Sequence, residues 1–257
     1  MSETATPREP MLRAPAIILW LCALYLLVQL VMATSGPGSQ SFFLVHLGLF
    51  PARFFAEGLN GLPGGLGQGL VTLVSYSFLH GGWSHCILNM VWLLAFGAPV
   101  AQRMGTRRFL LLFLLCIVLA GLAQIMVAPR ADWLIPIIGA SGGVSGMMGA
   151  AARFAFPETR WLSPQAARAA RPLLALRDVP KRRPVIMFII IWLGLNMIFG
   201  LLGPGGYATP DGQPANIAWV AHLAGFFTGL FAIGLIERPP LSASGGPGNV
   251  DYGDWKK

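Results

Sequence analysis

The feature of this sequence that most restricts its possible folds is a series of apolar segments as long as a membrane is thick. A helix that crosses the hydrocarbon core needs about 20 predominantly apolar residues. Four segments meet this requirement directly: residues 15–34, 83–102, 108–128 and 184–203. Two others are less regular, because 216–236 contains His222 and three glycines, and 139–155 is short and rich in small side chains. The pattern predicts an all-α polytopic membrane protein with six transmembrane helices, the fourth of them short.

The composition supports a lipid environment. Of the 257 residues, 55% are hydrophobic and 11% charged, whereas soluble domains carry about 25% charged residues. The net charge of +8 would suit nucleic acid, but the basic residues lie between apolar segments and form no stripe interleaved with aromatic residues. The three cysteines lack the spacing of a zinc site. We therefore expect the lipid bilayer as a partner, no nucleic acid and no metal.

The distribution of lysine and arginine predicts the orientation. Sixteen of the 18 basic residues lie in the amino-terminal segment, the connections after the second and fourth helices, and the carboxyl tail, which leaves Arg53 and Arg130 for the other side. By the positive-inside rule, both termini are cytoplasmic. The first apolar segment has no convincing cleavage site and is expected to remain as a span. The compact six-helix chain suggests a prokaryotic inner membrane.

The predicted organisation is one membrane domain over 15–236, between a cytoplasmic segment 1–14 and a disordered cytoplasmic tail 237–257. The long external segment 35–82 is rich in glycine and phenylalanine and too apolar for a freely solvated loop. We expect it to lie partly in the membrane interface. Residues 156–182 are expected to form a cytoplasmic surface segment, and no oligomeric state is predicted.

Polar side chains inside a span are costly, so each is a hypothesis about function. Five stand out: His80, His85, Asn89, Ser141 and His222. The charged residues at the cytoplasmic helix ends mark the cytoplasmic boundary of the membrane. At a rise of about 1.5 Å per residue, Ser141 lies about 18 Å, Asn89 about 21 Å and His222 about 22 Å above this boundary. His85 lies one turn further toward the outside than Asn89. Three helices are thus predicted to direct polar groups into one layer that opens externally.

The backbone near Ser141 supports a site in this layer. Helix 139–155 is too short to cross the bilayer, so residues 133–138 must enter as non-helical chain whose polar groups are satisfied by protein or water. Ser141 is then expected at a helix amino terminus, where free N–H groups favour a developing anion. Small residues recur every four positions on two helices, and such faces allow close approach: Gly142, Gly146 and Ala150, and Ala221, Gly225 and Gly229.

Serine becomes a good nucleophile when an adjacent histidine takes its proton, and the resulting oxyanion needs donors. We predict that Ser141 is the nucleophile and His222 the base, with donors from His85, Asn89 and the Ser141 N–H. Because no intramembrane acid is present to complete a triad, a dyad without a cofactor is expected. Ser145 is interpreted as a packing residue, and Asn196 as a hydrogen-bonding link between helices.

Three motifs in order resemble those of rhomboid intramembrane serine proteases: His80-x4-His85-x3-Asn89, Gly139-Ala140-Ser141-Gly142 and Ala221-His222-x2-Gly225. The resemblance covers roughly residues 15–236. It implies a rhomboid-like six-helix bundle with a short central fourth helix, transmembrane proteins as substrates, and the roles given above. His80 would be a supporting residue. One departure is that Val71 and Thr72 occupy the place of a Trp-Arg pair in the family's first external loop.

Three alternatives remain. A catalytically silent relative would bind transmembrane clients, although such relatives typically lose the serine or histidine. A transporter or channel would typically show internal repeats or charged residues along a pathway. A metal hydrolase would need His80, His85 and His222 together, but the first two lie five residues apart, which is unsuitable for one helix face, and no carboxylate completes the set.

Overall fold

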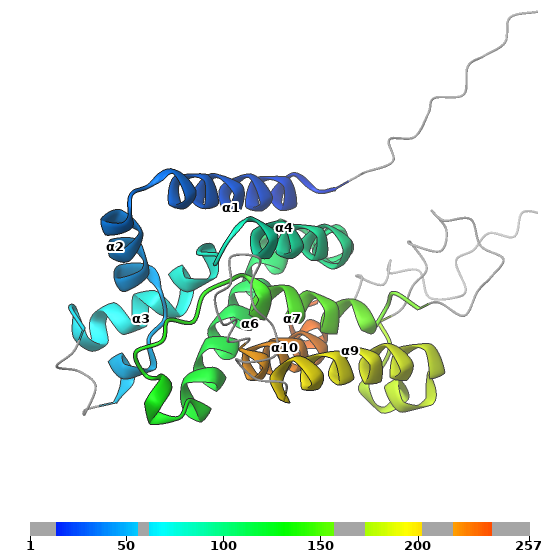
Figure 1. Cartoon of the computed structure of the whole chain (residues 1–257). Coiled ribbons are helices and arrows are strands. Elements are labelled where there is room, and N and C mark those ends of the chain that lie inside the picture. Colours follow the sequence, from blue (N-terminus) through cyan, green and yellow to red (C-terminus); the bar gives the residue numbers. More distant parts are fainter. Residues whose placement is uncertain (1–13, 56–61, 157–172, 202–217, 238–257) are drawn as a thin grey trace, which may run out of the picture.

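The computed structural model describes residues 14–55, 62–156, 173–201 and 218–237, and these form a bundle of helices (Figure 1). The α-helices are α1 (Ala16–Thr34), α2 (Pro37–Leu47), α3 (Gly65–Ser75), α4 (Trp83–Trp92), α5 (Ala98–Met104), α6 (Thr106–Val127), α7 (Ser141–Ala152), α9 (Arg183–Leu201) and α10 (Trp219–Ile236). Of the predicted terminal segments, residues 1–13 and 238–257 lie outside the described residues, as do residues 157–172 of the segment 156–182.

Four of the described helices are long and apolar enough to cross a membrane: Ala16–Thr34, Trp83–Met104, Thr106–Val127 and Trp219–Ile236. The second of these is continuous through α4, a π-helical segment at Leu93–Gly97 and α5. Pro99 follows the π-helical segment and has no N–H to donate to the carbonyl four residues earlier, which accounts for a wider turn at this point. The apolar part of α9, Arg183–Ile198, is shorter than these four, and α7 has twelve residues.

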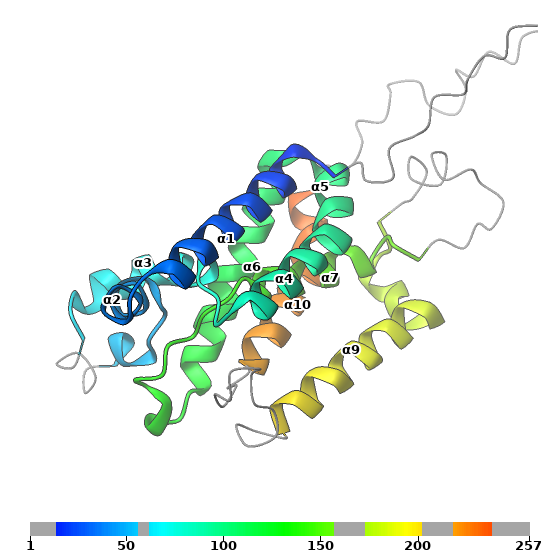
Figure 2. The same cartoon turned by 45° about the horizontal axis from the view of Figure 1, so that its top comes forward.

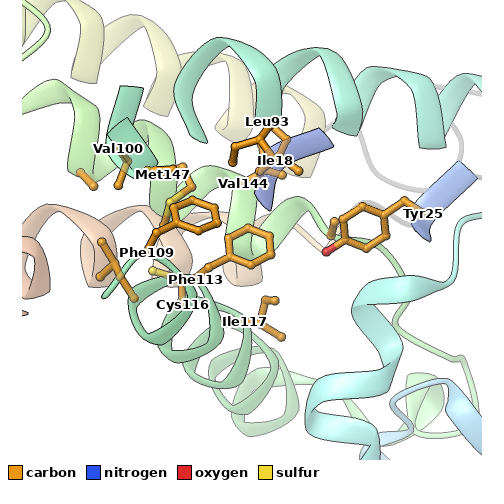
Figure 3. Packing of buried hydrophobic residues seen from close by; sticks show 14 of the residues in the cluster. Ile18, Tyr25, Leu93, Val100, Phe109, Phe113, Cys116, Ile117, Val144 and Met147 are labelled. Carbon is orange, nitrogen blue, oxygen red and sulfur yellow. The ribbon is translucent and has the colours of Figure 1, made fainter. Parts of the chain in front are cut away.

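Helix α7 lies at the centre of the bundle. It contacts α4, α5, α6, α9 and α10, and every residue from Gly142 to Ala152 is buried. Its small side chains leave room for the larger residues of α6, such as Phe109 and Phe113, which point toward Val144 and Met147 of α7 (Figure 3). Helix α1 passes along α4 to α5 on the outside of this core (Figure 2). A short, small-residue helix can therefore be enclosed on all sides.

The glycine faces of α7 and α10 meet backbone to backbone, as predicted. A β-carbon added at Gly225 would overlap the carbonyl of Gly142, and one at Gly229 would overlap the carbonyl of Gly146. Gly149 lies in the same way against the carbonyl of Phe226. Such contacts exclude any side chain at these positions, so the glycines fix the separation and register of the two helices.

The first loop is largely helical. Helices α2 and α3 are joined by hydrogen bonds from the Gln68 side chain to the His46 carbonyl at 2.5 Å and from the Ser75 hydroxyl to the Leu47 carbonyl at 2.8 Å. Apolar side chains of α3, including Leu66 and Leu70, are exposed. An exposed apolar face is consistent with the predicted place of this loop in the membrane interface.

Arg53 holds the centre of this loop together. Its side chain is 1% exposed, and its guanidinium donates to the carbonyls of Gly48 (3.3 Å), Val45 (2.5 Å) and Pro63 (3.4 Å). Its guanidinium also lies 5.2 Å from the centre of the Phe50 ring. Val71 is exposed, and the Thr72 hydroxyl bonds the Gly69 carbonyl within α3. An arginine elsewhere in the loop therefore anchors it, although the Trp-Arg pair is absent.

Charged residues link the helix ends far from Ser141. Arg103 of α5 forms an ion pair with Glu237 after α10 at 2.7 Å, and Arg153 after α7 donates to the carbonyls of Leu230 (3.2 Å) and Leu174 (2.8 Å). The carboxyl ends of α5, α7 and α10 thus come together at one end of the bundle. This is the end that the charge distribution assigns to the cytoplasm.

Candidate active site

Residues 133–138 lead to Ser141 as turns followed by extended chain, and several of their backbone groups are bonded to protein. Leu49 and Ile137 exchange two backbone hydrogen bonds at 3.1 and 2.9 Å, and the N–H of Ala52 donates to the Trp133 carbonyl at 3.1 Å. The N–H of Gly139 donates to the Tyr76 carbonyl at 3.0 Å. The predicted non-helical entry is confirmed, and the first loop is what satisfies it.

Ser141 is the first residue of α7, as predicted. No side chain caps the helix at Ala140, and the first hydrogen bond of the helix runs from Val144 back to Ala140. The N–H groups of Ser141, Gly142 and Gly143 in the first turn therefore have no partner within the helix. This end of a helix carries partial positive charge, which favours an anion.

The structure brings Ser141 and His222 together. The imidazole Nε2 of His222 lies 2.7 Å from the Ser141 hydroxyl oxygen, and both residues are partly exposed. The start of α10 is held by the Gln124 side chain, which accepts the N–H of Ala221 at 3.2 Å. A serine in hydrogen-bond contact with a histidine is the geometry of an activated nucleophile and its base.

Asn196 is a member of this group that sequence reasoning did not place in the site. Its Oδ1 lies 3.0 Å from Nδ1 of His222, and its Nδ2 donates to the Trp192 carbonyl at 2.9 Å. The prediction of a link between helices is correct, but the partner is the histidine itself. The available signal was a polar residue within an apolar span, which requires a named partner.

His85 lies beside Gly139. Its Nδ1 accepts the N–H of Gly81 at 3.3 Å, and because a neutral imidazole has one donor, Nε2 carries the proton. A β-carbon at Gly139 would lie 2.9 Å from Nε2 of His85 and 3.7 Å from the hydroxyl oxygen of Ser141. The donor atom of His85 and the serine hydroxyl thus face the same glycine, whose φ is +118°.

The remaining candidates lie close to this group. Asn89 is buried one turn from His85 and donates to the His85 carbonyl at 2.9 Å, which occupies one of its two amide protons. Its described hydrogen bond does not reach Ser141. His80 is buried with its ring edge-on to His85, at 5.0 Å between ring centres, and to Tyr25 at 5.6 Å. His80 therefore packs behind His85.

The structure also bears on the second serine of α7, Ser145, and on the alternative of a metal site. Ser145 is buried one turn further along α7, and the His222 imidazole bonds Ser141 instead. Within the described ranges, no three His, Cys, Asp or Glu side chains gather as a metal site would require. Gly142 and Gly225, predicted as supporting residues, are in the backbone contact described above.

These elements define a class of protein: a helical membrane bundle with a serine and a histidine paired at the start of a central short helix. The model of the Rhomboid domain matches residues 67–239, more than half of the chain. The chain belongs to the rhomboid family.

Curated relatives agree with this assignment. The chain is 27% identical over 158 residues to the Rhomboid protease GlpG of Yersinia pestis (strain Pestoides F) and to that of Yersinia pseudotuberculosis serotype O:3 (strain YPIII). The match covers 61% of this chain and 45% of each relative, so less than half of their length is represented.

Proposed function

We propose that this chain is an intramembrane serine endopeptidase that cleaves transmembrane segments of other proteins. The observation that carries the proposal is the 2.7 Å contact between Ser141 and His222 at the free amino terminus of α7. Membership of the rhomboid family and the similarity to relatives named rhomboid proteases support the same reaction class. The proposed setting is a membrane, with both termini cytoplasmic and the six apolar segments predicted from the sequence as spans.

The proposed reaction is an acyl transfer in two stages. The Ser141 hydroxyl oxygen attacks the carbonyl carbon of the scissile bond while His222 Nε2 takes the hydroxyl proton. The C–N bond then breaks, and His222 returns this proton to the leaving amine. Water attacks the acyl-enzyme, giving its proton to His222, and the serine hydroxyl is regenerated.

The oxyanion formed at each stage requires donors in fixed positions. The Ser141 N–H at the start of α7 and the protonated Nε2 of His85 beside Gly139 are the proposed donors, with Asn89 as the third. Asn89 retains one amide proton beyond its bond to the His85 carbonyl. Removal of one such donor typically lowers the rate about 10²-fold to 10³-fold.

A substrate helix must unwind before its carbonyl can reach Ser141, because helical carbonyls are already hydrogen-bonded. Residues that destabilise a helix, such as proline and glycine, lower this cost. The substrate is therefore expected to enter from the lipid near its external end and to carry such residues at the cleaved bond.

The test uses purified full-length protein in lipid vesicles with a fluorogenic transmembrane substrate. Ser141→Ala and His222→Ala are expected to lose at least about 10³-fold in rate, whereas the matched control Ser145→Ala, one turn along the same helix, retains activity. A fluorophosphonate probe should label the wild type and Ser145→Ala but not Ser141→Ala. Absence of both cleavage and labelling in the wild type would overturn the proposal in favour of a silent client-binding protein.

A further inference from the structure

Two of the contacts between α9 and α10 lie one helical turn apart on both helices. Trp192 of α9 stacks on Phe226 of α10, with ring centres 4.3 Å apart and planes inclined by 18°. One turn away on each helix, Asn196 bonds His222. Because residues four apart lie on one helix face, a single α9 face meets a single α10 face. The aromatic pair thus sets the position from which Asn196 reaches the histidine.

The amide of Asn196 is oriented by its second hydrogen bond. Its Nδ2 donates to the Trp192 carbonyl at 2.9 Å, and this places Oδ1 toward the imidazole at 3.0 Å from Nδ1. The reversed amide would direct Nδ2 at the ring and leave two oxygens, the side-chain Oδ1 and the backbone carbonyl, facing each other. The side chain is only 9% exposed, so water does not readily replace either bond.

The orientation of this amide determines the tautomer of His222. An amide oxygen can only accept, so Nδ1 of the neutral imidazole must carry the proton. Nε2 then presents its lone pair to the Ser141 hydroxyl at 2.7 Å, as a general base requires. When Nε2 takes the serine proton, the Nδ1–H remains bonded to an oxygen that favours the resulting cation.

We infer that Asn196 is a positioning residue that holds His222 in its Nδ1-protonated form for proton transfer from Ser141. The inference rests on the proposed function for its catalytic consequence, but the tautomer itself is a property of the resting protein. Asn196 contacts the imidazole of His222, and its proposed effect on the reaction is through that side chain.

The first test is spectroscopic and needs no substrate. In protein labelled with ¹⁵N-histidine, the His222 signal is assigned by its loss in His222→Gln. The wild type should show His222 protonated at Nδ1, and Asn196→Leu should lose this preference. Leu195→Ala, an exposed position next to it on α9, should leave the signal unchanged. Predominant Nε2 protonation in the wild type would overturn the inference, whether or not any variant folds.

The second test separates positioning from structure by kinetics. Asn196→Leu should lower kcat about tenfold, the effect of one lost hydrogen bond in the transition state, with KM and melting temperature close to the wild type. Asn196→Asp keeps an oxygen that can accept from Nδ1 but loses the donor to the Trp192 carbonyl, so it should recover only part of the activity. Equal kcat for the wild type and Asn196→Leu would refute the inference alone. A wild type that cleaves nothing would refute the proposed function, and the tautomer measurement would still decide the inference.

Discussion

Gly225 of α10 lies against the carbonyl of Gly142 of α7. Gly225 is three residues after His222, and Gly142 directly follows Ser141. The serine and the histidine are 81 positions apart in the chain, so their 2.7 Å contact depends on how closely these two helices pack. A side chain at this crossing would separate the helices by more than a hydrogen bond can span. The glycine contact therefore sets the distance on which the proposed chemistry depends.

Replacing Gly225 by valine is expected to abolish cleavage and to destabilise the protein by about 2 kcal/mol or more, because α10 must move away from α7. Thermal unfolding in detergent and the rate of fluorophosphonate labelling at Ser141 measure the two effects. Gly194→Ala is the matched control, since a β-carbon at Gly194 of α9 meets nothing within 4 Å. Unchanged unfolding and labelling in Gly225→Val would contradict the packing described.

This crossing was predictable from the sequence because its cause is local. Small residues at a spacing of four define one face of a helix, and intramembrane polar residues on that face mark one depth. The same holds for Ser141 at a helix start, because helix 139–155 is too short to span. The hydrogen bonding of residues 133–138 was also predictable, because backbone polar groups without a partner are costly in lipid.

Asn196 and Arg53 could not be placed from the sequence, for a different reason. Which face of α9 meets α10 depends on the aromatic stack of Trp192 on Phe226, and no periodicity specifies that pairing. Arg53 was expected only as an external charge, yet its carbonyl partners come from the carboxyl end of α2 and from Pro63 before α3. Contacts of this kind depend on the folded path of the chain.

Gly139→Ala is expected to lower kcat on the order of tenfold to a hundredfold, because the new methyl group would press on Nε2 of His85 at 2.9 Å. The control is Gly105→Ala, which also has a positive φ of +74° but no atom within 4 Å of the added carbon. Both variants bear the cost of an alanine at positive φ, about 1–3 kcal/mol. Only the first should lose activity beyond its loss of stability, and an equal loss in both would show that strain alone is responsible.

The predicted orientation can be tested by labelling introduced cysteines. The native Cys22, Cys86 and Cys116 are buried, so a membrane-impermeant maleimide should leave them unmodified in intact cells. Phe42→Cys in α2, at an exposed position, should react from outside, because the first loop is expected to be external. Arg177→Cys, in the segment before α9, should react only after the membrane is opened. The reverse pattern would place both termini on the outside.

Arg53→Gln is expected to destabilise the protein by about 2–4 kcal/mol, because a buried charged donor with three carbonyl partners is lost. The first loop also pairs with the chain leading to Ser141, through Leu49 and Ile137, so loosening the loop should reduce labelling of Ser141 together with stability. Arg177→Gln is the control, since the Arg177 side chain is 86% exposed. Thermal unfolding and fluorophosphonate labelling of both variants provide the measurement. If Arg53→Gln unfolds like the control, the loop is held by its helix contacts and not by the arginine.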